Sequence, residues 1–131
     1  MAITTSAITS SFKRELLAGD HDIAASGDTL KLTLYTDSSV IGPGLASYTA
    51  SGEVGNSGDY TAGGKTLAGQ TTSLSGTTAI ADFTDLSYLT ATISAMGALI
   101  YNSSKSNKSI AVLDFSTVKT STAGTFTIQF P

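Results

Sequence analysis

Apolar and polar residues alternate clearly in two parts of the chain. In residues 30–35, three leucines alternate with lysine, threonine and tyrosine, which predicts a strand that buries one face. Residues 125–130 alternate in the same way up to the end of the chain. We expect two sets of apolar side chains from these strands in the core. They are Leu30, Leu32 and Leu34, and Phe126, Ile128 and Phe130.

Shorter runs of apolar and β-branched residues give further strand candidates, separated by turn signals that include Gly69, Gly76 and Gly124. The candidates are residues 46–49, 65–68, 70–74, 78–83, 86–94, 97–102 and 109–115, the last with Ile110, Val112 and Leu113 as core residues. Many short strands with polar turns are typical of an all-β antiparallel β-sandwich or a jelly-roll-like barrel. We predict such a β-sandwich domain over residues 28–131.

The first 27 residues follow a different pattern, which predicts an N-terminal arm and one short helix over residues 1–27. Residues 1–10 are small or β-branched without a clear period and suit an extended arm. Ser11 is a candidate N-cap for a helix in which Phe12 and Leu16 share one face. Gly19 then offers the residue that ends the helix.

Composition restricts the chemistry of this chain. Charged residues make up 13% of it, about half of the usual share. The formal net charge of −3, without a stripe of Lys or Arg, argues against a nucleic-acid partner. The chain has no cysteine, which excludes a disulfide scaffold and a thiolate metal site.

The sequence offers no membrane or export signal that we recognise. Residues 1–17 lack a basic segment followed by an apolar one, so we expect no signal peptide. The least polar run, residues 91–101, is interrupted by Thr, Ser and Gly and is too short to span a bilayer. We expect no membrane partner and a protein that is made in a cytoplasm.

The segment GDYTAGGKT, residues 58–66, ends like a nucleotide-binding P-loop. The P-loop pattern requires a glycine at position 59, which is Asp59 here, and Gly58 lies one residue too early. The neighbouring residues predict neither the preceding core strand nor the following helix that phosphate binding requires. We therefore interpret the segment as a glycine-rich turn that enters a strand, and we expect no nucleotide cofactor.

Other candidate sites are weak as well. His21 is the only histidine, and between Asp20 and Asp22 it fits a solvated turn better than a metal site or a general base. Calcium binding by Asp20, Asp22 and Asp28 would need a ligand spacing that is absent here.

The remaining acids and serines give no stronger candidate. Asp82, Asp85 and Asp114 could pair for glycoside hydrolysis, but two of them fit strand ends and turns better. No serine lies in a G-x-S-x-G pattern. We expect no metal, no cofactor and no catalysis, and a small hydrolase is the enzyme alternative.

Five segments, in this order along most of the chain, resemble a family of small virion structural proteins of tailed bacteriophages. The segments are residues 11–19, 30–36, 60–64, 97–102 and 124–131. The resemblance implies a component of the virion, assembled in the host cytoplasm. It carries over no catalytic residue.

A β-domain of low charge without a site, preceded by an arm, suits a protein that packs in many copies. Our leading expectation is a capsid decoration (cement) protein that braces the phage head as a homo-oligomer, as a trimer, on the major capsid protein. Phe12, Leu16 and Leu17 would then dock on the capsid or on a neighbouring copy.

The alternative is a tail, baseplate or fibre component that contacts host-surface glycans. In that case Tyr48 and Tyr60 would be the stacking surfaces, beside the glycine-rich loop of residues 52–64.

Overall fold

The computed structural model describes residues 6–36 and 41–131, and these form an all-β fold with one short helix. The elements in chain order are β1 (Ala7–Ile8), α1 (Ser10–Leu17), β2 (Leu30–Tyr35), β3 (Lys65–Thr66), β4 (Thr71–Ser75), β5 (Thr78–Asp82), β6 (Leu86–Asn102) and β7 (Lys108–Ile128). Residues 1–5 of the predicted arm, and Val40 of the long loop, lie outside the described residues.

All strand pairs are antiparallel, and they form two sheets. The larger sheet has the order β1-β7-β6-β2-β3, and the smaller one consists of β4 and β5. The prediction of an all-β, sandwich-like antiparallel fold is therefore confirmed. The described part of the arm pairs with the sheet of its own chain, through Ala7 opposite Val112.

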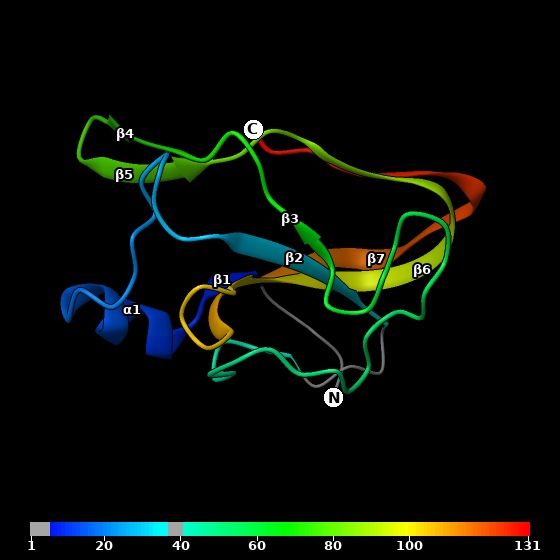
Figure 1. Cartoon of the computed structure of the whole chain (residues 1–131), viewed down its shortest axis with the longest axis horizontal. Coiled ribbons are helices and arrows are strands. Elements are labelled where there is room, and N and C mark those ends of the chain that lie inside the picture. Colours follow the sequence, from blue (N-terminus) through cyan, green and yellow to red (C-terminus); the bar gives the residue numbers. More distant parts are fainter. Residues whose placement is uncertain (1–5, 37–40) are drawn as a thin grey trace.

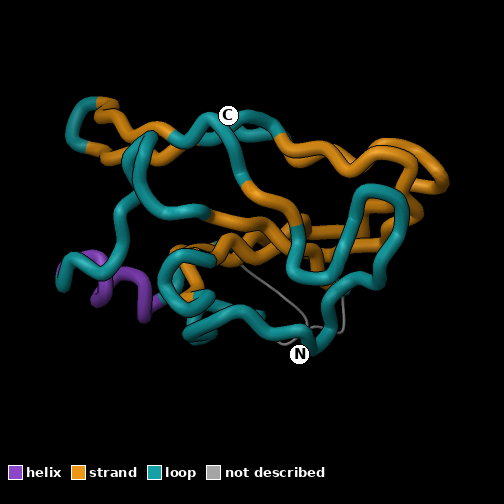
Figure 2. Tube along the Cα trace, in the orientation of Figure 1, coloured by secondary structure: helices purple, strands orange, loops and turns teal. Residues whose placement is uncertain are grey.

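The long strands β6 and β7 form one hairpin that folds over on itself. Their pairing runs from Asn102 opposite Lys108, next to the turn, to Leu86 opposite Ile128 at the far end. Both strands leave the lower layer on the right of Figure 1 and return above it, next to the C-terminus. Figure 2 shows strand backbone around most of this bend. One hairpin thus supplies both layers of the sandwich.

The sequence predicted separate strands where β6 and β7 are each continuous, and that prediction was wrong. Four register shifts interrupt the pairing without ending it, and they allow the strands to bend. Thr90, Ser116 and Ala123 have positive φ in this region. The middle of β7 is polar because it is exposed to solvent. The predicted strand at 46–49 amounts to one isolated bridge, between Ser47 and Lys108.

The core lies on both faces of the larger sheet. The principal cluster fills the space between the layers and includes the predicted leucines of β2. Its buried members are Phe12, Leu30, Leu32, Leu34, Val54, Tyr60, Leu67, Leu86, Tyr88, Ala91, Ile93, Ala95, Ala98, Ile100, Ile110, Phe126 and Ile128. Leu113 and Phe130, which were expected in the core, are partly buried against it.

A second cluster covers the opposite face of the same sheet. It contains Tyr35, Leu99, Tyr101 and Val112, whose neighbours along each strand point to the other side, together with Ile41 of the loop that follows β2. The prediction that β2 buries only one face was therefore wrong. Thr33 and Tyr35 are as fully buried as the leucines, because the 41–48 loop packs over their side of the sheet.

Candidate interaction surface

Helix α1 ends at the glycine that the sequence indicates. Gly19 has a φ of 77°, its N–H donates to the Leu16 carbonyl, and the Asp20 N–H donates to the Glu15 carbonyl. This pair of hydrogen bonds is the Schellman arrangement that stops a helix. The start differs by two residues, because α1 begins at Ser10 and its N-cap is Thr9 instead of Ser11.

A buried polar network attaches α1 to the body of the molecule. The Asn102 side-chain amide donates to His21 Nδ1 at 2.9 Å, so the other ring nitrogen, Nε2, carries the hydrogen of the neutral imidazole. That Nε2–H donates to Glu15 Oε2 at 3.2 Å, and the same oxygen lies 3.3 Å from the Lys108 ammonium. The prediction of a solvated His21 was wrong, because Phe12 and this network cover its ring.

Helix α1 also presents two leucines to solvent. Leu17 is 92% exposed and Leu16 is 49% exposed, although both belong to a helix that Glu15 anchors. Phe12 was expected to dock with them, and that expectation was wrong, because Phe12 is a core residue with 6% exposure. The exposed apolar pair therefore sits on a rigid base.

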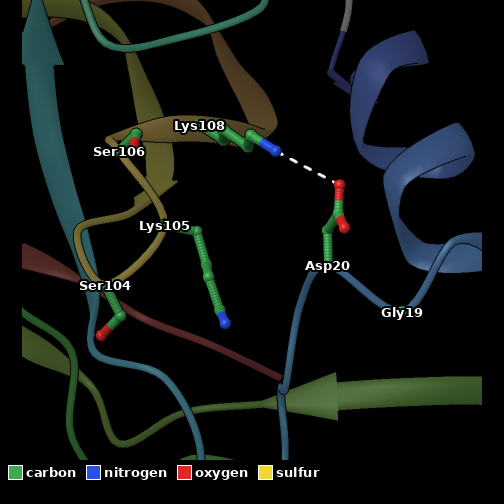
Figure 3. Close-up of a pocket in the computed structure, with 6 residues that line it drawn as sticks. All are labelled: Gly19, Asp20, Ser104, Lys105, Ser106 and Lys108. Carbon is green, nitrogen blue, oxygen red and sulfur yellow. Dashed lines mark hydrogen bonds and ion pairs between the residues drawn. The ribbon is translucent and has the colours of Figure 1, made fainter.

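A shallow polar hollow of about 280 Å³ lies next to this network, between the end of α1 and the turn that joins β6 to β7. Figure 3 shows Asp20 reaching the Lys108 ammonium across it, at 3.2 Å, while the Lys105 side chain points into the hollow. Hydrogen bonds to Asp20 first, and then to Glu15, raise the pKa of Lys108. These charges tie the helix to the turn, and they leave no free acid–base pair directed into the hollow among the described residues.

The glycine-rich turn is held by a tyrosine and glutamate cluster. Glu53 Oε1 accepts hydrogen bonds from the Tyr60 hydroxyl and the Gly63 N–H, each at 2.7 Å. Its other oxygen accepts from the Tyr48 hydroxyl at 2.6 Å, and the Tyr101 hydroxyl donates to the Gly63 carbonyl. The turn then enters β3, as the sequence interpretation stated.

The expectation that Tyr60 offers a stacking surface for glycans was wrong. Its ring is 1% exposed and its hydroxyl also accepts the Leu34 N–H, so it supports the core. Tyr48 is partly buried and already stacks on the Tyr101 ring, at 5.0 Å between centroids. The structure therefore does not bring Tyr48 and Tyr60 together as an exposed aromatic face.

The remaining acids that we weighed have structural partners. Asp22 Oδ1 accepts from the Ala24 N–H, and Asp85 Oδ1 accepts from the Phe130 N–H. Burial raises the pKa of Asp28, but hydrogen bonds from the Asp22 N–H and the Asn102 amide outweigh it, and the net pKa lies below the usual value. Within the described ranges, no three acids or histidines gather in a way that could hold a metal ion.

Sequence reasoning missed Glu15, Glu53 and Asn102, which organise both polar clusters. Only Glu15 has a signal in the sequence, since it lies three residues after Phe12 on the same helix face.

In the part of the chain that the structure describes, no helix is long and apolar enough to cross a membrane. Comparison of the chain with protein-family models, curated proteins and solved structures finds no match.

Proposed function

We propose that this chain is a structural protein of a tailed-bacteriophage virion, and that it binds the outside of the head as a homo-oligomer, as a decoration protein does. The proposal combines the resemblance in sequence with one structural observation. A rigidly anchored helix presents Leu17 and Leu16 to solvent, with 92% and 49% of their surfaces exposed. An exposed apolar pair on a fixed support is suited to docking on another protein surface.

The anchoring of α1 affects how the protein would dock on its partner. Because Glu15, His21 and Lys108 hold α1 against the sheet, its outward leucines keep one orientation. Docking then orders few additional side chains, which lowers the entropic cost of binding. The partner in this proposal is the major capsid protein, and burial at the seams between subunits would brace the shell against internal pressure.

The decisive measurement is the number of copies of this chain in purified particles, determined by quantitative mass spectrometry against the major capsid protein. A copy number comparable with that of the capsid protein supports decoration of the head lattice. A few copies per particle would place the chain in the tail or neck, and absence from the particles would contradict a virion role altogether.

A matched pair of variants tests the docking surface itself. Leu17→Lys removes the most exposed leucine of α1, and we expect it to lower the copy number on particles because a charge cannot be buried there unpaired. Leu89→Lys is the control, since Leu89 is an exposed leucine of β6 with 52% exposure. Equal occupancy by both variants would show that α1 is not the docking element.

A further inference from the structure

The β4–β5 hairpin stands apart from the two layers of the sandwich. It extends to the upper left in Figure 1, and it forms a sheet of its own in which no third described strand takes part. Nine of its ten strand residues are exposed, and the tenth, Asp82, is intermediate. A two-stranded hairpin with both faces in water is marginally stable at best, so this one is expected to gain stability from another chain.

The more apolar face of the hairpin faces solvent. The register pairs Leu74 with Ala79 and Thr72 with Ala81, and these four side chains share one face. Leu74 is 75% exposed. The opposite face carries Ser, Thr, Asp82 and Ile80, of which Ile80 is more covered, at 39%. An apolar face directed away from its own core indicates an interface.

The two edges of the hairpin are open for strand pairing. The two-residue loop has Gly76 at its first position with a φ of 61°, which fits a type II′ turn and makes Ser75 and Thr78 a hydrogen-bonded pair. Pairs then alternate along the ladder, so the backbone N–H and C=O groups of Thr72 and Ala81 point outward. No lysine, proline or bulge protects either edge, although native edges usually have such protection.

The lack of charge on most of the hairpin permits a second copy of this chain as the occupant. The chain has a formal net charge of −3, so copies of it repel one another in general. Asp82, at the end of β5 far from the loop, is the one charged residue of the two strands, so two copies can meet at residues 71–81 of this hairpin without opposing like charges. An antiparallel edge also pairs with itself around a two-fold axis, and the Ser and Thr side chains of the two copies can then hydrogen-bond across the seam.

We propose that the β4–β5 hairpin is a self-association site, at which a second copy of this chain adds its own hairpin edge to edge and extends the sheet. Backbone hydrogen bonds of Thr72 or Ala81 would join the copies, and the Leu74 faces would become one continuous apolar surface. This inference rests on the homo-oligomer of the proposed function and names a seam between copies; a two-fold seam joins copies in pairs, which differs from the trimer that the sequence analysis expects.

Sedimentation velocity of the purified full chain over a wide range of concentrations tests the proposal. We expect reversible association by the natural sequence, and a dissociation constant at least about tenfold higher for Leu74→Lys, which adds a charge to the hairpin face. Thr72→Pro and Ala81→Pro each remove one outward N–H while keeping the inner ladder, so one of the two should also weaken association. Leu89→Lys should leave it unchanged, and circular dichroism should show every variant folded.

Two outcomes would overturn the proposal. They are a natural sequence that stays monomeric at all concentrations, and association that none of the three hairpin variants weakens. Because no phage particle enters the experiment, its result is independent of the copy number on particles. The seam between copies and the virion role can therefore fail separately.

Discussion

At the scale of single residues, the buried carboxylate of Glu15 is the most exacting feature of this molecule. It is 3% exposed and receives both the His21 ring N–H and the Lys108 ammonium on one oxygen. A buried charge requires such partners, because an unpaired one would lose its hydration without compensation. The network therefore holds the helix in one position, and that position depends on every residue of the network.

Replacement of Glu15 should expose this dependence. Glu15→Ala leaves the buried Nε2–H of His21 without an acceptor, and we expect a loss of about 1–3 kcal/mol in the free energy of unfolding. Asp20→Ala is the matched control, because Asp20 pairs with the same lysine at an exposed position and should cost less than about 1 kcal/mol. Urea unfolding measures both, and equal losses would mean that the burial of Glu15 contributes nothing.

Single residues also show how much of the structure could be predicted from the sequence alone. The place of Glu15 on the buried face of α1 follows from its spacing to Phe12. The buried state of His21 does not, because its partner Asn102 is 81 positions away along the chain. Likewise, the burial of Tyr60 depends on Glu53 and on the sheet above it, so the local sequence showed only an aromatic residue in a glycine-rich turn.

At the scale of elements, the glycine-rich turn is fitted tightly against β2. Gly64 has a φ of 78°, and a Cβ on it would overlap the Leu32 carbonyl of that strand. A side chain at position 64 is thus excluded for two reasons, which are the backbone conformation and the lack of space. Gly64 of GDYTAGGKT therefore serves the close approach of β3 to β2, whereas a Cβ on Gly58 would overlap the backbone of Leu89 and Thr90 in β6.

A pair of alanine substitutions tests this reading of the turn. We expect Gly64→Ala to lower the free energy of unfolding by more than about 2 kcal/mol, because it adds strain at a fixed backbone position. Gly55→Ala lies in the same loop, where an added Cβ meets nothing within 4 Å, and should change stability by less than about 0.5 kcal/mol. Equal denaturation midpoints for the two variants would contradict this role of Gly64 in the close approach of β3 to β2.

Strands with alternating apolar residues were predictable, and so were the exposed strands β4 and β5 on either side of Gly76, whereas the exposed middle of β7 was not. β2 and the C-terminal end of β7, residues 125–128, carry the period of two, so their location was correct. The stretch 116–124 lacks apolar alternation, because both its faces are largely solvated, and it therefore resembled a loop in sequence. The continuity of β6 and β7 arises from their pairing with each other, which a local pattern does not encode.

At the scale of the whole molecule, the tyrosines hold the two layers and the loops together. All five have a pKa above the ordinary value, chiefly because burial disfavours the phenolate, and Tyr35 reaches about 12. Glu53 adds to the effect at each of them through its negative charge. Folding therefore favours the neutral tyrosines.

The sign of this linkage predicts an alkaline limit to stability. A tyrosine with a raised pKa stabilises the fold fully below its unfolded pKa of about 10, and this contribution is lost as the pH rises through the folded pKa. We expect tyrosinate absorbance to rise above pH 10 in one cooperative step, together with the loss of the circular dichroism of the strands. Stepwise ionisation near pH 10 by a chain that remains folded would contradict the burial of these side chains.

The folded-over hairpin has a consequence for how the protein reaches its structure. Asn102 and Lys108 are close in sequence, whereas Leu86 and Ile128 meet only after a much longer loop has closed. Because short loops close at lower entropic cost, pairing should nucleate at the β6–β7 turn and zip outward, around the bend, to the C-terminus. The upper layer would then form last, so its residues should govern the rate of unfolding more than the rate of folding.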